Sequence, residues 1–357
     1  MGVRQTVDPD AGSRGPDMTR FVCTSNHGFA PYAVEELRRL IPGASFRMIE
    51  PGAVFELTAD GGRDEVLARI RRDEPIFLRH IQPVDLALPI AGGPEDLGAL
   101  AGFVRGRSGR FAGRRTAVHI RRREGTPFPY AVSEAKAALD DALREIGAEP
   151  AMQSADVILS IYASGSELLV GAGTAEEMLS DWPGGAIRFR REDGQISRAK
   201  FKLLEAERTF NLRLDKHERA LDIGAAPGGW TSLLLERGLR VTAVDPADLH
   251  PSLAGHPRVT WLKRNAGDVS FPPGAFDLLV CDMNWEPATM AKTVLHHAPS
   301  LQAGAEAIVT VKLLHRKPLQ TIRNITEMLG RAFHTRRAKQ LFHNRDEITL
   351  YLIHKGE

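Results

Sequence analysis

The sequence predicts an α/β protein, with a doubly wound α/β domain in its C-terminal half preceded by two smaller α+β domains. Two observations support this prediction. From residue 197 onward, short apolar segments alternate regularly with helical stretches, and Leu278-Leu279-Val280 is apolar on both faces, as in a parallel strand covered by helices. Before residue 197 the strand and helix patterns are shorter and follow a different order.

Composition limits the class of protein. The 357 residues are enough for two or three domains, and 43% hydrophobic with 26% charged residues is typical of a globular protein. No apolar run approaches the roughly 20 residues of a membrane-spanning helix, so no membrane partner is expected. Two cysteines allow neither a disulfide framework nor a zinc cluster, so no metal site is expected. We expect a cytoplasmic protein, with a monomer favoured.

The first small domain is predicted over residues 19–83, after a disordered tail at residues 1–18. The turn signal Pro51-Gly52 separates two β-prone segments, and a helical pattern lies on either side of this pair. The expected elements are a strand (21–24), a helix (31–40), two strands (45–49 and 53–57) and a helix (63–71). This order indicates a small, ferredoxin-like α+β domain.

The second small domain, residues 84–175, holds the densest basic charge. Eight arginines and no acid lie between Arg105 and Arg123. That density is expected of a surface that follows a phosphate backbone, although a solvated loop is the alternative. The RNA-binding candidates are Arg114, Arg115, Arg121 and Arg122.

Secondary-structure signals in this second domain are less regular. The expected elements are a helix (97–104), a strand (116–122), a helix (133–146) and an antiparallel strand pair (156–162 and 167–170). Residues 176–196, with Pro183-Gly184-Gly185, are predicted to be a linker to the domain at residues 197–357. Strands are expected there at 220–223, 240–244, 259–262, 277–281, 307–311 and 348–353.

The segment from Gly224 to Trp230 is the most informative part of the chain. It is a glycine-rich turn between a buried strand and a helix, and glycines let a backbone pass close to a bulky ligand. Its spacing is neither that of the dinucleotide fingerprint nor that of a P-loop. Asp245, at the end of the next strand, has the position that accepts ribose hydroxyls. A nucleoside ligand without phosphates is indicated, which points to S-adenosylmethionine; a tight turn without a ligand is the alternative.

The residues predicted to bind this cofactor follow from the same pattern. For Trp230, packing in the protein core is the alternative to packing under the cofactor. The cofactor-binding candidates are Gly224, Ala225, Pro227, Gly228, Gly229, Trp230, Asp245, Asn265 and Asp282.

The glycine-rich segment resembles the cofactor loop of the FtsJ-type (RrmJ-type) ribose 2′-O-methyltransferases. That family also carries a Lys-Asp-Lys-Glu tetrad, and four segments of this chain are similar to those that hold it. The segments are Ser197-Arg198-Ala199-Lys200-Phe201-Lys202-Leu203, Cys281-Asp282-Met283, Val309-Thr310-Val311-Lys312 and Arg345-Asp346-Glu347-Ile348-Thr349. The resemblance covers residue 197 to the C-terminus and implies a Rossmann-like methyltransferase domain with the catalytic residues Lys202, Asp282, Lys312 and Glu347.

Two further segments are most similar to the RlmM group, which methylates a cytidine of 23S rRNA. They are 281–287 and 339–349. Members of that group carry a THUMP domain, and the element order between residues 97 and 173 is similar to THUMP. The family usually has an acid after the third strand that contacts the adenine amino group. Here Asn265 takes that place, and Asp268 is the alternative contact.

The tetrad suits methylation of an alcohol, because the 2′-oxygen must lose its proton as it attacks the sulfonium methyl group. A lysine is a base only when neutral, and its ordinary pKa is about 10.4. A second ammonium, burial and the sulfonium charge all lower that pKa. We therefore assign Lys312 as the base and Lys202 as the neighbouring cation, with Asp282 orienting Lys312 and Glu347 holding both lysines and the ribose.

The sequence thus predicts an RNA ribose 2′-O-methyltransferase that uses S-adenosylmethionine and no metal. The expected partner is 23S rRNA or a precursor ribosomal particle. A tRNA ribose methyltransferase is the alternative enzyme, since THUMP-like domains also occur in tRNA-modifying enzymes. A cofactor-binding assembly factor without turnover is the alternative from another class.

Overall fold

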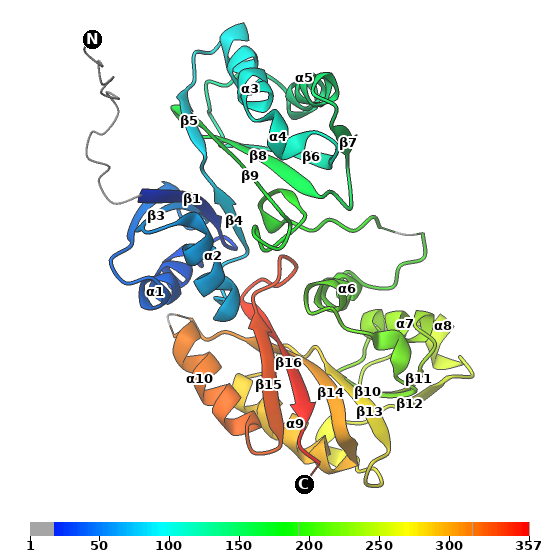
Figure 1. Ribbon diagram of the computed structural model, residues 1–357. Helices are drawn as coiled ribbons and strands as arrows, with labels where there is room; N and C mark the ends of the chain where they lie inside the picture. Colours follow the sequence, from blue (N-terminus) through cyan, green and yellow to red (C-terminus); the bar gives the residue numbers. More distant parts are fainter. Residues whose placement is uncertain (1–17, 192, 316, 357) are drawn as a thin grey trace, which may run out of the picture. The chain divides into compact units, whose positions relative to one another are not determined.

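The computed structural model describes residues 18–191, 193–315 and 317–356, and the chain divides into two compact units, residues 1–185 and 186–357 (Figure 1). The tail predicted at residues 1–18 lies outside the described residues except for Met18, which begins the first strand.

The first part of unit 1 is an antiparallel sheet of four strands in the order β2-β3-β1-β4. Its elements are β1 (Met18–Thr24), α1 (Ala30–Leu40), β2 (Ser45–Glu50), β3 (Val54–Asp60), α2 (Arg63–Arg72) and β4 (His80–Pro83). The order of these elements fits the expected α+β domain, which the short strand β4 completes. Sequence patterns did not predict β4, because four residues ending in a proline show no periodicity.

The second part of unit 1 is a five-stranded sheet in the order β5-β9-β8-β6-β7. Its elements are β5 (Leu86–Pro89), α3 (Pro94–Gly106), α4 (Ser108–Phe111), β6 (Arg115–Arg122), α5 (Val132–Glu145), β7 (Glu149–Ala151), β8 (Val157–Ala163) and β9 (Glu167–Gly173). Helices α3 and α5 pack against each other and, through apolar residues such as Leu100 and Leu139, against the sheet (Figure 1). The arginine-rich segment is therefore the end of α3, the short helix α4 and the strand β6.

A buried side chain joins the two sheets of unit 1. Gln82 in β4 donates hydrogen bonds to the carbonyl oxygens of Ser160 and Leu169, and it accepts one from the hydroxyl of Ser160. Because Gln82 is fully buried, losing these partners would leave polar atoms without water. The two sheets are thus parts of one compact unit.

Unit 2 is built around a seven-stranded sheet in the order β12-β11-β10-β13-β14-β16-β15 (Figure 1). Neighbouring strands from β12 to β14 are parallel, whereas β16 runs antiparallel to both β14 and β15. The strands are β10 (Arg219–Ile223), β11 (Arg240–Val244), β12 (Val259–Leu262), β13 (Phe276–Cys281), β14 (Leu301–Lys312), β15 (Phe333–Lys339) and β16 (Glu347–His354). The helices are α6 (Lys200–Thr209), α7 (Gly229–Glu236), α8 (Pro251–Ala254), α9 (Pro287–His297) and α10 (Pro318–Leu329).

The core of unit 2 lies between helices and the parallel strands. Leu203 of α6 and Leu233 of α7 belong to one buried cluster with Leu278 of β13 and Ile308 of β14. The strand order changes direction between β10 and β13, since the chain builds outward on one side to β12 and then on the other to β14. In doubly wound sheets ligands bind at the carboxyl ends of the strands beside such a point.

Candidate active site

Three predicted site residues follow three neighbouring parallel strands. Ile223 pairs in register with Val244 on one side and with Cys281 on the other. The next residues along the chain are Gly224, Asp245 and Asp282, so they meet at the same edge of the sheet. The structure therefore brings the glycine-rich loop, the expected ribose acid and the expected catalytic acid to one place.

The glycines of the loop are required by the protein itself. Gly224 and Gly228 have φ angles of +76° and +114°, a region that other residues rarely adopt. A Cβ at Gly224 would lie 2.3 Å from Cγ of Met283, and one at Gly228 would lie 2.1 Å from Cδ1 of Leu253. The sequence interpretation placed a ligand against these glycines, whereas here their close neighbours are side chains of the protein.

Asp245 shapes the loop. One carboxylate oxygen accepts a hydrogen bond from the backbone amide of Ala226 at 3.0 Å, and the other accepts one from Ala247 at 2.8 Å. A carboxylate has about four acceptor positions, so lone pairs remain for ribose hydroxyls. Asn265 and Asp268, the two candidate contacts for the adenine, are hydrogen-bonded to each other at 3.0 Å and are both exposed.

Trp230 is a core residue. Its side chain is 3% exposed and belongs to the buried cluster of unit 2. Its indole N–H donates to the carbonyl oxygen of Ala199 at 2.8 Å, which ties α7 to the residues before α6. Of the two interpretations of Trp230, the structure favours the core role.

A cavity of about 660 Å³ brings the four tetrad candidates together. Lys202 comes from the first turn of α6, Asp282 follows β13, Lys312 ends β14 and Glu347 begins β16. Lys312 and Glu347 are also register partners across the antiparallel pair β14 and β16. The four residues are far apart in the sequence, and only the sheet topology places them around one space.

Lys202 is held between two carboxylates. Its Nζ lies 2.9 Å from Oδ1 of Asp282 and 2.6 Å from Oε1 of Glu347. Burial alone lowers the pKa of this lysine, but the two negative charges and their hydrogen bonds outweigh burial, so its pKa is raised. Lys202 is therefore a fixed cation in this structure.

The pKa of Glu347 is also shifted by its surroundings. Its pKa is raised by burial, against the charge of Lys202, and the charge of Asp282 raises it further. The raised pKa of Lys202 and the raised pKa of Glu347 have the same cause, because one ammonium between two carboxylates cannot neutralise both. A second positive charge, or a proton, is stabilised beside this pair.

Lys312 differs from Lys202 in its contacts. It is exposed, and within the described parts of the chain it has neither an ion pair nor a side-chain hydrogen bond. The expectation that Asp282 orients Lys312 is wrong for this structure, because Asp282 accepts hydrogen bonds from Lys202 and from the hydroxyl of Thr310. The strand β14 itself sets the position of Lys312.

The cavity has a wall that the sequence interpretation missed. Phe201, Asn284, Phe342 and His343 line it together with the tetrad. Buried Glu205 of α6 fixes the last two by accepting hydrogen bonds from both of their backbone amides and contacting the His343 ring at 2.7 Å. Single residues carry no periodic signal, and the only clue was that all four lie in the family-like segments 197–203, 281–287 and 339–349.

A buried acid beneath the loop was also missed. Asp222 in β10 accepts a hydrogen bond from the hydroxyl of Thr231 at 2.6 Å. Burial raises the pKa of Asp222 to about 7, and the charges of Asp282 and Asp245 act in the same direction. Its side chain supports α7 from inside the domain.

The structure corrects the prediction that Arg121 belongs to a basic surface. Its Nη1 donates to the hydroxyl of Thr24 in β1 at 2.7 Å, and its guanidinium lies 5.0 Å from the centre of the Tyr162 ring. Burial lowers the pKa of Arg121 to about 10. Residues 116–120 of β6 are all buried, so both faces of this strand are covered there, and Arg121 next to them is half-buried.

The other RNA-binding candidates are exposed but do not form one continuous run. Arg114 and Arg115 lie at the start of β6 and Arg122 at its end, roughly 20 Å away. Arg122 donates to the carbonyl oxygens of Phe128 and Tyr130. Acids from elsewhere in the sequence balance part of the charge, as in the pair between Arg105 and Glu145 at 2.7 Å.

No group of His, Cys, Asp or Glu side chains among the described residues is arranged to hold a metal ion. Within the same residues, no helix is both long enough and apolar enough to cross a membrane.

Comparisons with known proteins found similarity to methyltransferases. The profile of a family described as FtsJ-like methyltransferase matches residues 195–342. The ribosomal RNA large subunit methyltransferase M of Halorhodospira halophila is 40% identical over 173 residues, which are 48% of this chain and 50% of the relative. The protein of the same name from Laribacter hongkongensis is 33% identical over 215 residues, or 56% of this chain and 60% of the relative.

The chain thus spans between 50% and 60% of the length of these two curated relatives. Among solved structures, that of TrmN from Thermus thermophilus aligns with 94% of this chain and 99% of its own, at 17% identity and a TM-score of 0.40.

Proposed function

From the FtsJ-like methyltransferase domain that residues 195–342 form, we propose that this chain methylates a ribose 2′-hydroxyl of RNA. The domain takes its methyl group from S-adenosylmethionine. The observation that carries the proposal is the cavity in which two lysines and two acids meet beside the glycine-rich loop. This set suits a hydroxyl acceptor, because an alcohol oxygen must lose its proton as it attacks the methyl group and a lysine can accept that proton.

The residues around the loop fit this cofactor. Asp245 keeps lone pairs for the ribose hydroxyls, and Asn265 with Asp268 offers both a donor and an acceptor for the adenine. Gly224 lies beside Met283, the residue after Asp282, so the loop adjoins the tetrad. When bound, S-adenosylmethionine supplies an electrophilic methyl group with a positive charge.

The two lysines have different roles in the proposed reaction. Lys312 accepts the proton of the 2′-hydroxyl, because it is the lysine that no carboxylate of the described residues holds as a cation. Lys202, fixed by Asp282 and Glu347, supplies a positive charge beside the oxygen as that oxygen becomes negative. Placing the hydroxyl in line with the methyl group supplies the remaining rate.

The substrate is proposed from the relatives and from unit 1. Both relatives are named as methyltransferases of large-subunit ribosomal RNA, so we propose 23S rRNA, or a precursor particle that contains it, as the substrate. Residues 84–175 would be a THUMP-like RNA-binding domain, with Arg114, Arg115 and Arg122 contacting phosphates. Phe201, Phe342 and His343 would stack on the base of the target nucleotide.

One experiment tests the proposed reaction directly. The full chain is incubated with S-adenosylmethionine labelled in its methyl group and with 23S rRNA transcript, and the RNA is digested to nucleosides. The proposal predicts label in a 2′-O-methylnucleoside, and no label with the Lys312→Ala variant. Label found only in base-methylated nucleosides would contradict it.

A further inference from the structure

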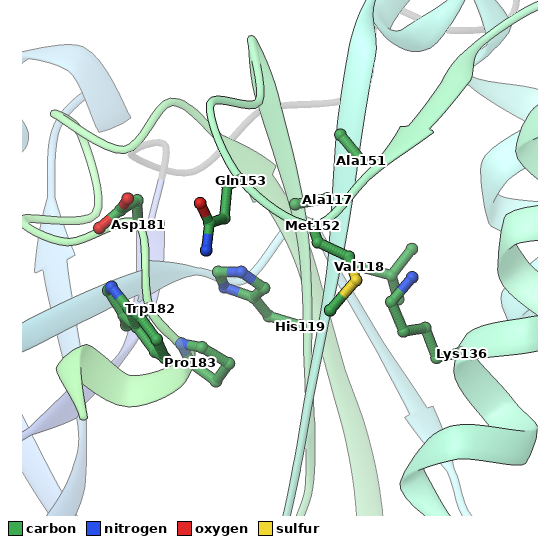
Figure 2. A pocket seen from close by; sticks show the side chains of 10 residues that line it. All are labelled: Ala117, Val118, His119, Lys136, Ala151, Met152, Gln153, Asp181, Trp182 and Pro183. Carbon is green, nitrogen blue, oxygen red and sulfur yellow. The ribbon is translucent and has the colours of Figure 1, made fainter. Parts of the chain in front are cut away.

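Unit 1 contains a second cavity, separate from the proposed methyl-transfer site. Its volume is about 220 Å³, and it lies between β6, the residues after β7 and the segment that ends unit 1 (Figure 2). Pockets for drug-sized ligands measure about 300–1,000 Å³, so this one has room for about one ring system.

Flat and apolar groups form much of the cavity wall. Trp182 and Pro183 lie side by side on one flank, and Met152 lies on another (Figure 2). Met152 is 85% exposed, whereas most methionines of folded proteins are buried. An exposed thioether and a half-buried indole beside a ring-sized cavity suit the face of an aromatic ligand.

Two polar side chains in the wall have unused hydrogen-bonding capacity. His119 is 6% exposed, and in the described part of the chain neither ring nitrogen has a hydrogen-bond partner. Burial lowers the pKa of His119 to about 4, so the ring is neutral near pH 7 and carries one donor and one acceptor. The side-chain amide of Gln153 points toward the same space and offers a donor and an acceptor as well (Figure 2).

Two charged side chains, Lys136 and Asp181, also line this cavity. Lys136 already pairs with Asp140 at 2.5 Å, and Asp181 is part of the wall, so the interior does not favour a phosphate. Arg115 donates to the carbonyl oxygen of Gln153 at 3.4 Å, which places its guanidinium beside one of the residues that line the cavity. A ligand with a neutral aromatic ring and a phosphate outside it would match this arrangement.

We propose that this cavity binds a single unpaired nucleobase of the RNA substrate, with the base against Trp182 and its flanking phosphate near Arg115. The inference rests on the proposed function for the identity of the polymer. Any of the bases has a flat face to stack on Trp182, and base edges carry the acceptors and donors that His119 and Gln153 match. The cavity would thus fix the register of the RNA on unit 1.

The test uses the full chain and a labelled, unstructured ten-nucleotide RNA as the probe, with a duplex of the same length for comparison. Trp182→Ala and Met152→Ala remove the proposed stacking surface, and Met48→Ala removes an exposed methionine elsewhere in unit 1 as the matched control. Base stacking on an aromatic side chain contributes about 1–3 kcal/mol. Affinity for the single strand should therefore fall about fivefold or more with Trp182→Ala, and less with Met152→Ala.

A conservative variant separates binding from folding. Trp182→Phe keeps an aromatic face and should keep most of the affinity. The chain has four tryptophans, so the quenching that belongs to Trp182 is the difference between wild type and Trp182→Phe, and the probe should quench wild type more than this variant. Equal affinities for wild type, Trp182→Ala and Met152→Ala would overturn the proposal, as would equal binding of the duplex with no quenching.

Failure of the proposed function can be distinguished from failure of the base pocket. If the chain does not methylate RNA but the probe still quenches Trp182, the methyltransfer proposal falls and the base pocket stands. If RNA is methylated but the variants bind the probe like wild type, the base pocket falls alone.

Discussion

Nζ of Lys202 lies 2.9 Å from Oδ1 of Asp282, and these two residues are 80 positions apart in the sequence. The first turn of α6 carries the lysine and the end of β13 carries the acid. This ion pair, with that to Glu347, raises the pKa of Lys202 and keeps it charged. It leaves Lys312, on the neighbouring strand, as the base in the proposed reaction.

Arginine substitutions should separate the two lysines. Arginine remains protonated at all relevant pH values, so Lys312→Arg should abolish methyl transfer. Lys202→Arg keeps a cation between Asp282 and Glu347 and should retain measurable activity, whereas Lys202→Ala should not. Calorimetry should show cofactor affinity within about tenfold of wild type for all three variants. An active Lys312→Arg enzyme would show that Lys312 is not the base.

Sequence motifs identified the four tetrad candidates, which line one cavity, but could not predict which of them pair. Their segments resemble a family motif, and parallel strands place Asp282 beside the glycine-rich loop. The partner of Asp282 depends on where α6 lies relative to β13 and on Thr310, whose hydroxyl also donates to Asp282. One polar residue between two valines gives no sign of that contact.

Asp222 should make stability depend on pH. Its pKa is raised to about 7, mainly by burial, so the folded state binds a proton that the unfolded chain releases above about pH 4. Its contribution to stability is therefore present at low pH and is lost as pH rises towards 7 and above. The isosteric Asp222→Asn variant has no such proton.

Thermal unfolding of wild type and Asp222→Asn at pH 5 and pH 8 measures this effect. The stability of wild type relative to the variant should fall between the two pH values, by at most about 1.4 kcal/mol per pH unit. An identical difference at both pH values would mean that Asp222 is ionised throughout.

Glycine substitutions should distinguish backbone strain from packing. Gly238 has a φ of +98°, and a Cβ added there would have no other atom within 4 Å, so Gly238→Ala should cost only the backbone strain of about 1–2 kcal/mol. Gly224→Ala adds a collision with Met283, next to Asp282, and should lower the unfolding temperature further and reduce methyl transfer. Equal effects of the two variants on both measurements would contradict the packing role of Gly224.

The arginine prediction changes with the structure. The slope of log affinity against log salt concentration has a magnitude of about 0.7 to 0.9 for each phosphate contact. Replacing Arg114, Arg115 and Arg122 by Ala should therefore lower that magnitude for RNA binding by about 2 to 3. A matched control replaces Arg39, Arg69 and Arg72, which are exposed arginines of α1 and α2. The same slope for the triple variant and wild type would mean that these three arginines do not contact the RNA.

Two features of the fold could not be predicted from the sequence patterns. Strand β15 is an edge strand whose central residues, His334 to Arg336, are exposed, so it lacks alternating hydrophobicity. The arginine run suggested one surface, but both faces of β6 are covered over residues 116–120, and Arg121 donates a hydrogen bond to Thr24 of β1. In both cases burial depends on neighbours that come from distant parts of the chain.

Mapping of 2′-O-methyl groups in the RNA of a deletion strain tests the proposed activity most directly. Loss of one 2′-O-methyl group from 23S rRNA is expected, with its return when the wild-type chain is supplied and no return with Lys312→Arg. An unchanged set of 2′-O-methyl positions in the deletion strain would contradict the proposal that this chain is a ribose methyltransferase.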